Sequence, residues 1–358
     1  MQVTSMSTRV HSALLTIGDP VPDLPLASQL GPKVSVHGPA FAGNPIVLLA
    51  CRHLEAPAMA ALGAVARLQD RFGALGARIM AVTGESIATN AAAAEKTMCR
   101  FPVLSDTLDR LLPMLDDTSG RPSASLLVID RGLRIVDRFR CDSASAVEAA
   151  LALCERMMDE ERGPAPIVVQ QAPVLLVPSV FPAALCARLV EHWGSAPEKE
   201  EDLAGFHRES GDPEVDVVSR RRPSVKRRTD WFVEEGPVHA EIRELLRRRV
   251  GPELRKAFDF TPGRCEQLRV GCYDAERGGY FRRHRDNVLG RRFSMSLNLN
   301  EDYEGGELCF PEYGRQLYRP PAGGALIFAA PLLHEVMEVR RGRRFVLVTF
   351  LCGKELPR

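Results

Sequence analysis

The spacing of apolar and polar residues changes near residue 160 and divides the chain into two parts. In the first part, residues 46–51 are all apolar, as in a strand buried on both faces, and apolar residues then recur at helical spacing over residues 59–72. Further elements are predicted as strands at residues 78–83, 125–130 and 134–140 and as a helix at residues 144–158. This alternation predicts an α/β domain with a central sheet.

The second part combines two helices with a long β region. Helical patterns cover residues 182–193 and 238–250, and short strands broken by glycine and proline turns predominate from residue 267. Residues 293–300 alternate strictly between apolar and polar, which is typical of a strand with one face in a core. These patterns predict a β sandwich or jelly roll.

A charged, proline-bearing stretch at residues 159–166 separates the two patterns and is typical of a linker. We therefore predict an α/β domain at residues 1–160, a linker at 161–172 and a mainly β domain with supporting helices at 173–358. A chain of 358 residues is also too long for one ordinary hydrophobic core.

Charge and composition narrow the functional classes. The 47 basic and 46 acidic residues nearly cancel, which argues against partners such as nucleic acid or an acidic membrane surface. The N-terminus lacks the features of a secretory signal, and the longest apolar runs are too short to span a membrane, so we expect a cytoplasmic protein. Nine cysteines without a CxxC pair are typical of reduced thiols.

Two histidines and one carboxylate form a candidate metal site in the β region. His284 and Asp286 are two residues apart, so on a strand their side chains point the same way, and His334 follows 48 residues later. Two histidines and a carboxylate are the ligands that hold non-haem Fe(II) with one face open. Taken alone, His284 fits a surface histidine in its basic run better than a metal ligand. His334 favours the metal site, because it directly follows a strand-like apolar segment.

Arg344 lies ten residues after His334, beyond a turn at residues 340–342. We predict that the strand it begins forms a hairpin with the strand of His334 and that Arg344 shares an inward face with Val346, Val348 and Phe350. A buried guanidinium without a partner is costly, so this arrangement predicts an anion beside Arg344. The alternative is an ion pair with a local carboxylate such as Glu338.

The motifs of residues 167–358 resemble the 2-oxoglutarate and Fe(II)-dependent dioxygenases, in particular the prolyl 4-hydroxylase-like branch. The resemblance is carried by Tyr273 through Tyr280 to the His284–Asp286 motif, by the stretch SLNLNEDYEGGEL at residues 296–308, and by the segment from His334 to Arg344. It implies a double-stranded β-helix, which is a form of jelly roll.

The resemblance also implies roles for these residues. His284, Asp286 and His334 would be the iron ligands, Arg344 would bind the far carboxylate of 2-oxoglutarate, and Tyr273 would donate a hydrogen bond to the same co-substrate. The implied enzyme uses Fe(II), 2-oxoglutarate and O2, with ascorbate as reductant. It hydroxylates a C–H bond of a protein, a peptide or a small molecule and releases succinate and CO2. Asn298 departs from the tyrosine that animal oxygen-sensing members carry at its position.

The first domain resembles the thioredoxin-like peroxiredoxins of the alkyl hydroperoxide reductase type. The resemblance rests on residues 17–23, on the strand that ends at Cys51, and on residues 101–106 and 127–132. Met59 occupies the place of the reactive cysteine and cannot form a thiolate. Cys51 is expected to be a small buried residue, so we predict a scaffold or docking domain.

Two alternatives to the dioxygenase remain open at this point. One is a thiol peroxidase that uses Cys51 in the first domain. The other is a non-catalytic sensor of iron or 2-oxoglutarate. The basic residues at 220–222 and 226–228 either line an entrance for an acidic or peptidic substrate or form a solvated charged loop, which is the commoner case, and we assign them no role.

Overall fold

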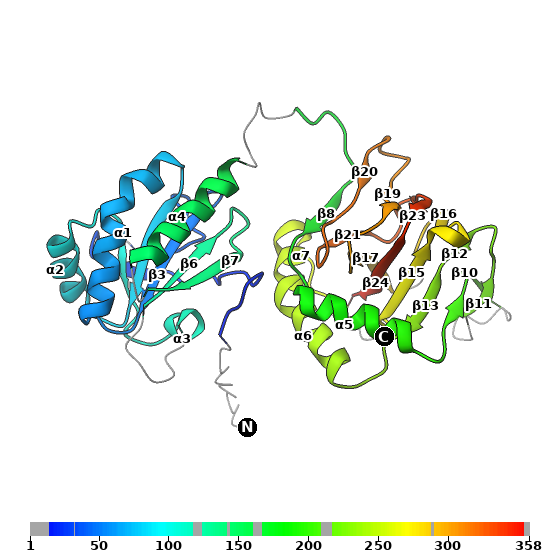
Figure 1. The fold of residues 1–358 in the computed structure, drawn as a ribbon, viewed down its shortest axis with the longest axis horizontal. Helices are drawn as coiled ribbons and strands as arrows, with labels where there is room; N and C mark the ends of the chain where they lie inside the picture. Colours follow the sequence, from blue (N-terminus) through cyan, green and yellow to red (C-terminus); the bar gives the residue numbers. More distant parts are fainter. Residues whose placement is uncertain are drawn as a thin grey trace, which may run out of the picture. The chain divides into compact units, whose positions relative to one another are not determined.

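The computed structural model describes residues 14–31, 33–116, 124–141, 144–159, 167–208, 217–287 and 290–353. The chain divides into two compact units, Met1–Ala165 and Pro166–Arg358 (Figure 1). The predicted linker falls largely outside the described residues, as far as residue 166. Within the described ranges, no helix is both long enough and apolar enough to cross a membrane.

Unit 1 contains one seven-stranded sheet in the order β2-β1-β5-β4-β3-β6-β7. Its strands are β1 (Leu26–Ser28), β2 (Lys33–Val34), β3 (Ile46–Cys51), β4 (Arg78–Thr83), β5 (Val103–Ser105), β6 (Ala124–Ile129) and β7 (Ile135–Arg140). Strand β3 runs parallel to β4 and antiparallel to β6, and all six of its residues are buried. This central position explains its unbroken apolar run.

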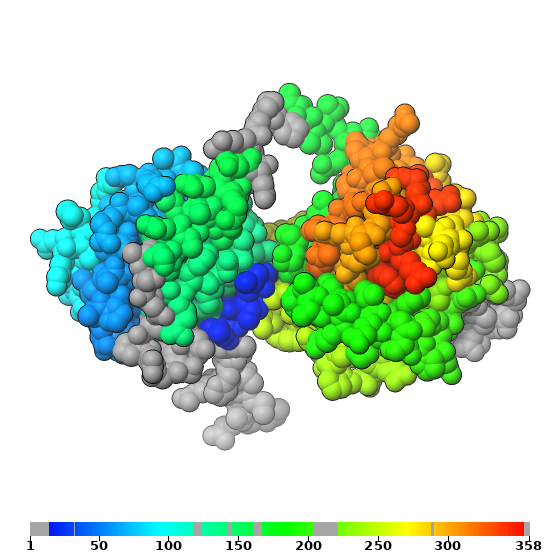
Figure 2. Space-filling model, viewed as in Figure 1, coloured from blue at the N-terminus to red at the C-terminus, as the bar shows by residue number. Residues whose placement is uncertain are grey.

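Helices cover both faces of this sheet. They are α1 (Ala56–Ala74), α2 (Ile87–Thr97), α3 (Leu112–Leu115) and α4 (Ala144–Asp159). Val47 and Leu49 pack in the same cluster as residues of α1 and α4, whereas Ile46 and Leu48 pack in another cluster with α3. Figure 2 shows α1 (blue) and α4 (green) on the outer surface of the unit. The predicted thioredoxin-like α/β fold is confirmed.

Unit 2 is built on an eight-stranded antiparallel sheet in the order β8-β21-β17-β24-β15-β13-β9, with β14 paired to β24. Its strands are β8 (Val174–Val177), β9 (Glu200–Glu201), β13 (Thr229–Phe232), β14 (Arg264–Cys265), β15 (Arg269–Asp274), β17 (Arg291–Asn298), β21 (Ala325–Ala329) and β24 (Arg343–Cys352). The helices of this unit are α5 (Ala183–Ser195), α6 (Pro237–Arg249), α7 (Gly251–Phe258) and the 3₁₀ turn η1 (Ala275–Arg277).

A second, five-stranded sheet has the order β12-β16-β22-β19-β20. Its strands are β12 (Lys226–Arg227), β16 (Tyr280–His284), β22 (His334–Val336), β19 (Leu308–Cys309) and β20 (Leu317–Tyr318). Two further strand pairs are β10 (Leu203–Arg208) with β11 (Val217–Arg221), and β18 (Glu304–Gly305) with β23 (Val339–Arg341).

The two faces of the larger sheet have different neighbours. Leu297 and Leu347 pack in one cluster with residues of α5, α6 and α7, so the helices cover this face. Val346 packs in another cluster with Leu308 and Val336 of the smaller sheet. Two facing antiparallel sheets with helices outside one of them form the jelly roll predicted for this half, which is confirmed.

The predicted hairpin between the strands of His334 and Arg344 was wrong. Strand β22 pairs with β16 and β19 in the smaller sheet, whereas β24 pairs with β15 and β17 in the larger one. Between them lies β23, which pairs with β18, and the turn at Gly342, with φ of 74°, joins β23 to β24. A jelly roll places successive strands in facing sheets, so Arg344 reaches the interior from the sheet opposite His334.

Candidate metal centre

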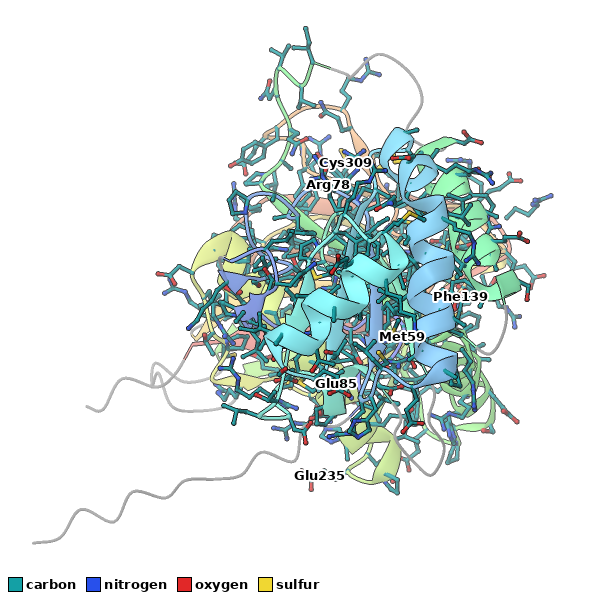
Figure 3. The ribbon with its side chains drawn as sticks, turned by 90° about the vertical axis from the view of Figure 1, so that its left-hand side faces the viewer. Met59, Arg78, Glu85, Phe139, Glu235 and Cys309 are labelled. Carbon is teal, nitrogen blue, oxygen red and sulfur yellow. The ribbon has the colours of Figure 1, made fainter. Side chains whose placement is uncertain are left out.

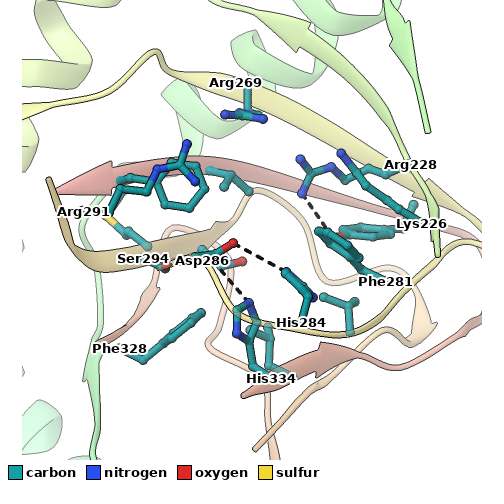
Figure 4. A pocket seen from close by; sticks show the side chains of 17 residues that line it. Lys226, Arg228, Arg269, Phe281, His284, Asp286, Arg291, Ser294, Phe328 and His334 are labelled. Carbon is teal, nitrogen blue, oxygen red and sulfur yellow. Dashed lines mark hydrogen bonds and ion pairs between the residues drawn. The ribbon is translucent and has the colours of Figure 1, made fainter. Parts of the chain in front are cut away.

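The three candidate ligands of the metal lie together inside unit 2 (Figure 4). His284 ends β16, Asp286 lies in the loop that follows, and His334 begins β22 directly opposite His284. Their ligand atoms all lie within 4.8 Å of one another. Nε2 of His284 is 3.6 Å from Oδ1 of Asp286, and Nε2 of His334 is 3.4 Å from its Oδ2. The structure therefore brings together the three residues that the sequence suggested.

Each histidine is oriented by a backbone carbonyl two residues earlier in the chain. Nδ1 of His284 lies 2.8 Å from the carbonyl oxygen of Arg282, and Nδ1 of His334 lies 3.0 Å from that of Leu332. Because a carbonyl only accepts, Nδ1 carries the proton in each ring and donates it. Both Nε2 atoms therefore keep a lone pair directed at the centre of the site, as metal-ligating histidines require.

The acid–base states of the site suit a cation. Burial, followed by the nearby His334, lowers the pKa of His284 from 6.5 to about 4, so its ring is neutral at pH 7. Burial opposes ionisation of Asp286, but the adjacent imidazoles of His334 and His284 and the hydroxyl of Ser294 hold its pKa below the ordinary value. A neutral imidazole and an ionised carboxylate are the forms that bind metal ions.

Arg344 is buried, with only 1% of its surface exposed. Its Nε and Nη2 donate to Oδ1 of Asn298 at 3.2 and 2.8 Å, and Nη2 also donates to Oγ of Ser296 at 3.3 Å. Nη1 is buried without a hydrogen-bond partner, and no carboxylate among the described residues pairs with the guanidinium, Glu338 included. These neutral acceptors orient the side chain without compensating its charge.

Tyr273 lines the cavity that holds the three ligands. It lies directly opposite Arg344 on the neighbouring strand, and the Arg344 guanidinium carbon is 5.5 Å from the centre of its ring. Its hydroxyl accepts a hydrogen bond from Nη1 of Arg228 at 3.2 Å. Arg344 itself does not line the cavity, but Tyr273 and Ser296, which both lie against it, do. The contact of Tyr273 with a co-substrate stays a prediction.

The polar face of β17 supports the site, which sequence reasoning missed. Ser294, Ser296 and Asn298 are all buried, although they alternate with core residues as solvent-facing positions do. Oγ of Ser294 donates to Oδ2 of Asp286 at 2.7 Å, while the other two residues hold Arg344. Polar residues on alternate positions of a strand in the middle of a jelly roll are the signal that could have revealed them.

Two of the basic residues before β13, Lys226 and Arg228, face the cavity and are not part of a solvated loop, whereas Arg221 and Arg227 are exposed as such a loop predicts. Lys226 and Arg228 are 2% and 5% exposed and line the cavity. Nζ of Lys226 donates to Oδ2 of Asp230 at 2.8 Å, and Nε of Arg228 donates to its Oδ1 at 2.5 Å. Sequence alone could not show that one buried carboxylate allows both cations to face inward.

Unit 1 contains no equivalent chemistry at the two positions that the sequence singled out. Met59 lies in the first turn of α1 (Figure 3). Cys51 is completely buried, as expected. Burial, followed by the charges of Asp116 and Glu85, raises the pKa of its thiol to about 12. A thiol with such a pKa is not a nucleophile at neutral pH.

Comparison with known families matches each half of the chain separately. Residues 268–352 match the 2OG-Fe(II) oxygenase superfamily, and residues 17–138 match the AhpC/TSA family. A PKHD-type hydroxylase from Synechococcus sp. is 32% identical over 122 residues, which cover 31% of this chain and 54% of the relative. One from Beijerinckia indica is 31% identical over 124 residues, with the same coverage. The chain thus spans about half the length of these curated relatives.

Solved structures also resemble each half. A prolyl-4-hydroxylase from Pseudomonas putida covers 51% of this chain and 94% of its own, with 18% identity and a TM-score of 0.38. Peroxiredoxin Q from Xanthomonas campestris covers 41% of this chain and 99% of its own, with 20% identity and a TM-score of 0.35. The AhpC/TSA match thus lies in unit 1 and the 2OG-Fe(II) oxygenase match in unit 2, and the candidate metal centre lies within the latter match.

Proposed function

We propose that unit 2 is an Fe(II)- and 2-oxoglutarate-dependent dioxygenase that hydroxylates a C–H bond and releases succinate and CO2. The observation that carries the proposal is the convergence of two imidazole Nε2 atoms and one carboxylate in a cavity beside a buried, uncompensated guanidinium. The relatives named as PKHD-type hydroxylases support the same reaction class. We propose a protein or peptide, as for prolyl hydroxylases, or a small molecule as the substrate.

The donor atoms fit Fe(II). Two neutral imidazole nitrogens and one carboxylate oxygen are donor atoms that suit Fe(II). Three protein ligands also leave coordination positions free for other ligands. The three ligand side chains are well shielded, and two of them take part in hydrogen bonds that fix their imidazole rings. Such bonds reduce the reorganisation needed when a metal binds.

The interior beyond the ligands fits 2-oxoglutarate. Arg344 provides a positive charge with an unpartnered Nη1, and a guanidinium binds a carboxylate through two parallel hydrogen bonds. Val348 and Leu308 line the cavity and give apolar walls that suit methylene groups. Asn298 stands at a position where animal oxygen-sensing members of the family carry a tyrosine. Its side-chain oxygen fixes the guanidinium of Arg344 and does not itself bind the carboxylate of 2-oxoglutarate.

Each side chain then has a defined task in the proposed reaction. Bound Fe(II), 2-oxoglutarate and O2 would supply the oxidising chemistry. His284, Asp286 and His334 would keep one face of the metal open, and Arg344 would orient the co-substrate. Phe328 and the other apolar walls would exclude water from the reacting atoms. For unit 1 we propose a scaffold or docking role that does not require thiol chemistry.

Succinate formation is the direct test of this function. The purified protein is supplied with Fe(II), 2-oxoglutarate and ascorbate in air, and His334→Ala is compared with wild type. We expect the variant to lose succinate formation by at least about 100-fold, because one of three ligands is missing. His239→Ala, on α6 and outside the ligand group, is the matched control. Equal rates in His334→Ala and wild type would show that the site assignment is wrong.

A further inference from the structure

Arg269 is a cation of the cavity whose charge the proposed metal and co-substrate do not use. It begins β15 and lines the same cavity as the three ligands. Its Nε is buried without a hydrogen-bond partner, and no carboxylate in the described part of the chain forms an ion pair with it. The neighbouring cations differ, because Arg228 pairs with Asp230 and Arg291 pairs with Glu266.

Aromatic rings hold the Arg269 guanidinium in place. Its central carbon lies 5.3 Å from the ring centre of Phe232 and 5.5 Å from that of Phe350. Burial, reinforced by the charges of Arg228 and Arg291, lowers the pKa of Arg269, although Asp230 acts in the opposite direction. The side chain stays charged at pH 7, because a guanidinium does not lose its proton in proteins. The rings fix its position but leave its edge available to an anion.

Strand register separates Arg269 from Arg344. Arg344 lies opposite Tyr273, whereas Arg269 lies opposite Val348, four residues further along β24. Four residues of a strand span about 13 Å. The Arg269 side chain also leans on Phe350, which lies opposite the Ser294 that holds Asp286. Arg269 therefore lines the part of the cavity near Ser294 and Asp286, whereas Arg344 lies against Tyr273 and Ser296, which line the other end.

We infer that Arg269 anchors a carboxylate of the primary substrate, so that the substrate of the proposed dioxygenase is an anionic acid with an apolar body. The inference rests on the proposed function and adds the substrate class. Figure 4 shows Arg291, Arg269 and Arg228 in an arc on one side of the candidate ligands, with Phe328 on the other side. An acid held by Arg269 would place its aliphatic carbons between these walls and next to the metal ligands.

The test uses straight-chain acids from propanoate to octanoate, each paired with its primary amide. The pairs share shape and apolar length and differ in charge. Succinate formation is measured on the full chain with Fe(II) and 2-oxoglutarate, with and without each compound. We expect at least one acid to stimulate turnover about tenfold more than its amide, because a charged pair in a buried site is stronger than a neutral one.

Variants identify the residue responsible for this preference. Arg269→Gln should reduce the acid-over-amide ratio to within about twofold of unity, while Arg269→Lys, which keeps the charge, should retain part of it. Arg227→Gln is the matched control, because Arg227 also lies over an aromatic ring, that of Tyr280, but is exposed and does not line the cavity. The control should keep both the turnover and the ratio of wild type.

Three results would overturn the inference. The first is that no acid exceeds its amide, the second is that Arg269→Gln keeps the preference, and the third is that this variant raises the KM for 2-oxoglutarate more than tenfold, which would place the co-substrate at Arg269. If wild type forms no succinate at all, the proposed function fails independently. Calorimetry with hexanoate and hexanamide on the Mn(II)-loaded protein then decides the anion site by itself, since equal affinities would exclude it.

Discussion

The two units differ in what surrounds their chemically suggestive residues, although both are similar to families of enzymes. In unit 1, Cys51 is buried within an apolar strand, its pKa is raised to about 12, and Met59 fills the first turn of the next helix. In unit 2, His284 and His334 are each oriented by a carbonyl and face the same carboxylate. A fold position predicts chemistry only when the side chain there has the required protonation state and orientation.

Uncompensated charge gives a second contrast. In unit 2 Arg344 is buried and Arg269 is partly buried, and each has one buried guanidinium nitrogen without a hydrogen-bond partner. A folded protein tolerates such groups when a ligand completes them, because an unpaired buried charge is otherwise destabilising. We therefore propose that ligands bind in unit 2, and the following variants test each part of this proposal in order of decreasing effect.

Removing the charge of Arg344 should have the largest effect. Arg344→Gln is expected to lower kcat/KM for 2-oxoglutarate by at least about 100-fold, mainly through KM, because truncating one partner of a buried charged pair costs about 2–5 kcal/mol. The measurement is succinate formation over a range of 2-oxoglutarate concentrations. Arg343→Gln is the matched control, since Arg343 is its exposed neighbour and pairs with Asp274. An unchanged KM for 2-oxoglutarate in Arg344→Gln would show that the co-substrate does not bind beside Arg344.

Titration of Lys226 should change how the free energy of unfolding depends on pH. Burial, followed by Arg228, lowers its pKa from 10.5 to about 8 despite the attraction of Asp230. Between these pH values the unfolded chain binds more protons than the folded one, so folded Lys226 becomes less destabilising as pH rises. The free energy of unfolding of wild type should gain about 3 kcal/mol relative to Lys226→Met between pH 8 and 10.5.

Tryptophan fluorescence during urea unfolding measures this difference for unit 2 alone. The chain has two tryptophans, Trp193 and Trp231, and both belong to that unit. Subtracting the free energy of unfolding of Lys226→Met from that of wild type removes the contributions of the other groups that titrate at alkaline pH. A difference that stays constant over the pH range from 8 to 10.5 would show that Lys226 titrates normally and that its burial is not costly.

Substitutions of the two serines of β17 should distinguish metal binding from co-substrate binding. Ser294→Ala removes the hydroxyl that donates to Asp286, and we expect an approximately tenfold weaker affinity for Fe(II), since supporting hydrogen bonds typically contribute about 10- to 100-fold. Ser296→Ala, two residues along the same face, is the matched variant, because Ser296 contacts Arg344 and should alter the KM for 2-oxoglutarate instead. Identical effects of both substitutions on both ligands would contradict this division.

Much of this organisation was predictable from local patterns. The strand Ile46–Cys51 was predicted with its observed bounds, because burial on both faces leaves an unbroken apolar signal. The three candidate ligands were predicted from residue type and spacing. The inward direction of Lys226 and Arg228 was not, because it depends on Asp230, and a charged run looks the same in sequence whether it is solvated or buried. The pairing of β24 was missed because sheet membership in a jelly roll is set by long-range contacts.

The smallest effect is expected at Cys51. Cys51→Ala should leave the rate of hydrogen peroxide consumption, measured with dithiothreitol as reductant, equal to that of wild type, because a buried thiol with a raised pKa forms almost no thiolate.

Met59→Cys is the informative counterpart, since it places a thiol in the first turn of α1, where a helix N-terminus favours the thiolate. Peptide mass spectrometry after brief alkylation should show that the introduced thiol of this variant is modified before Cys51. Loss of peroxide consumption in Cys51→Ala would instead make unit 1 a peroxidase and end the contrast between the two units.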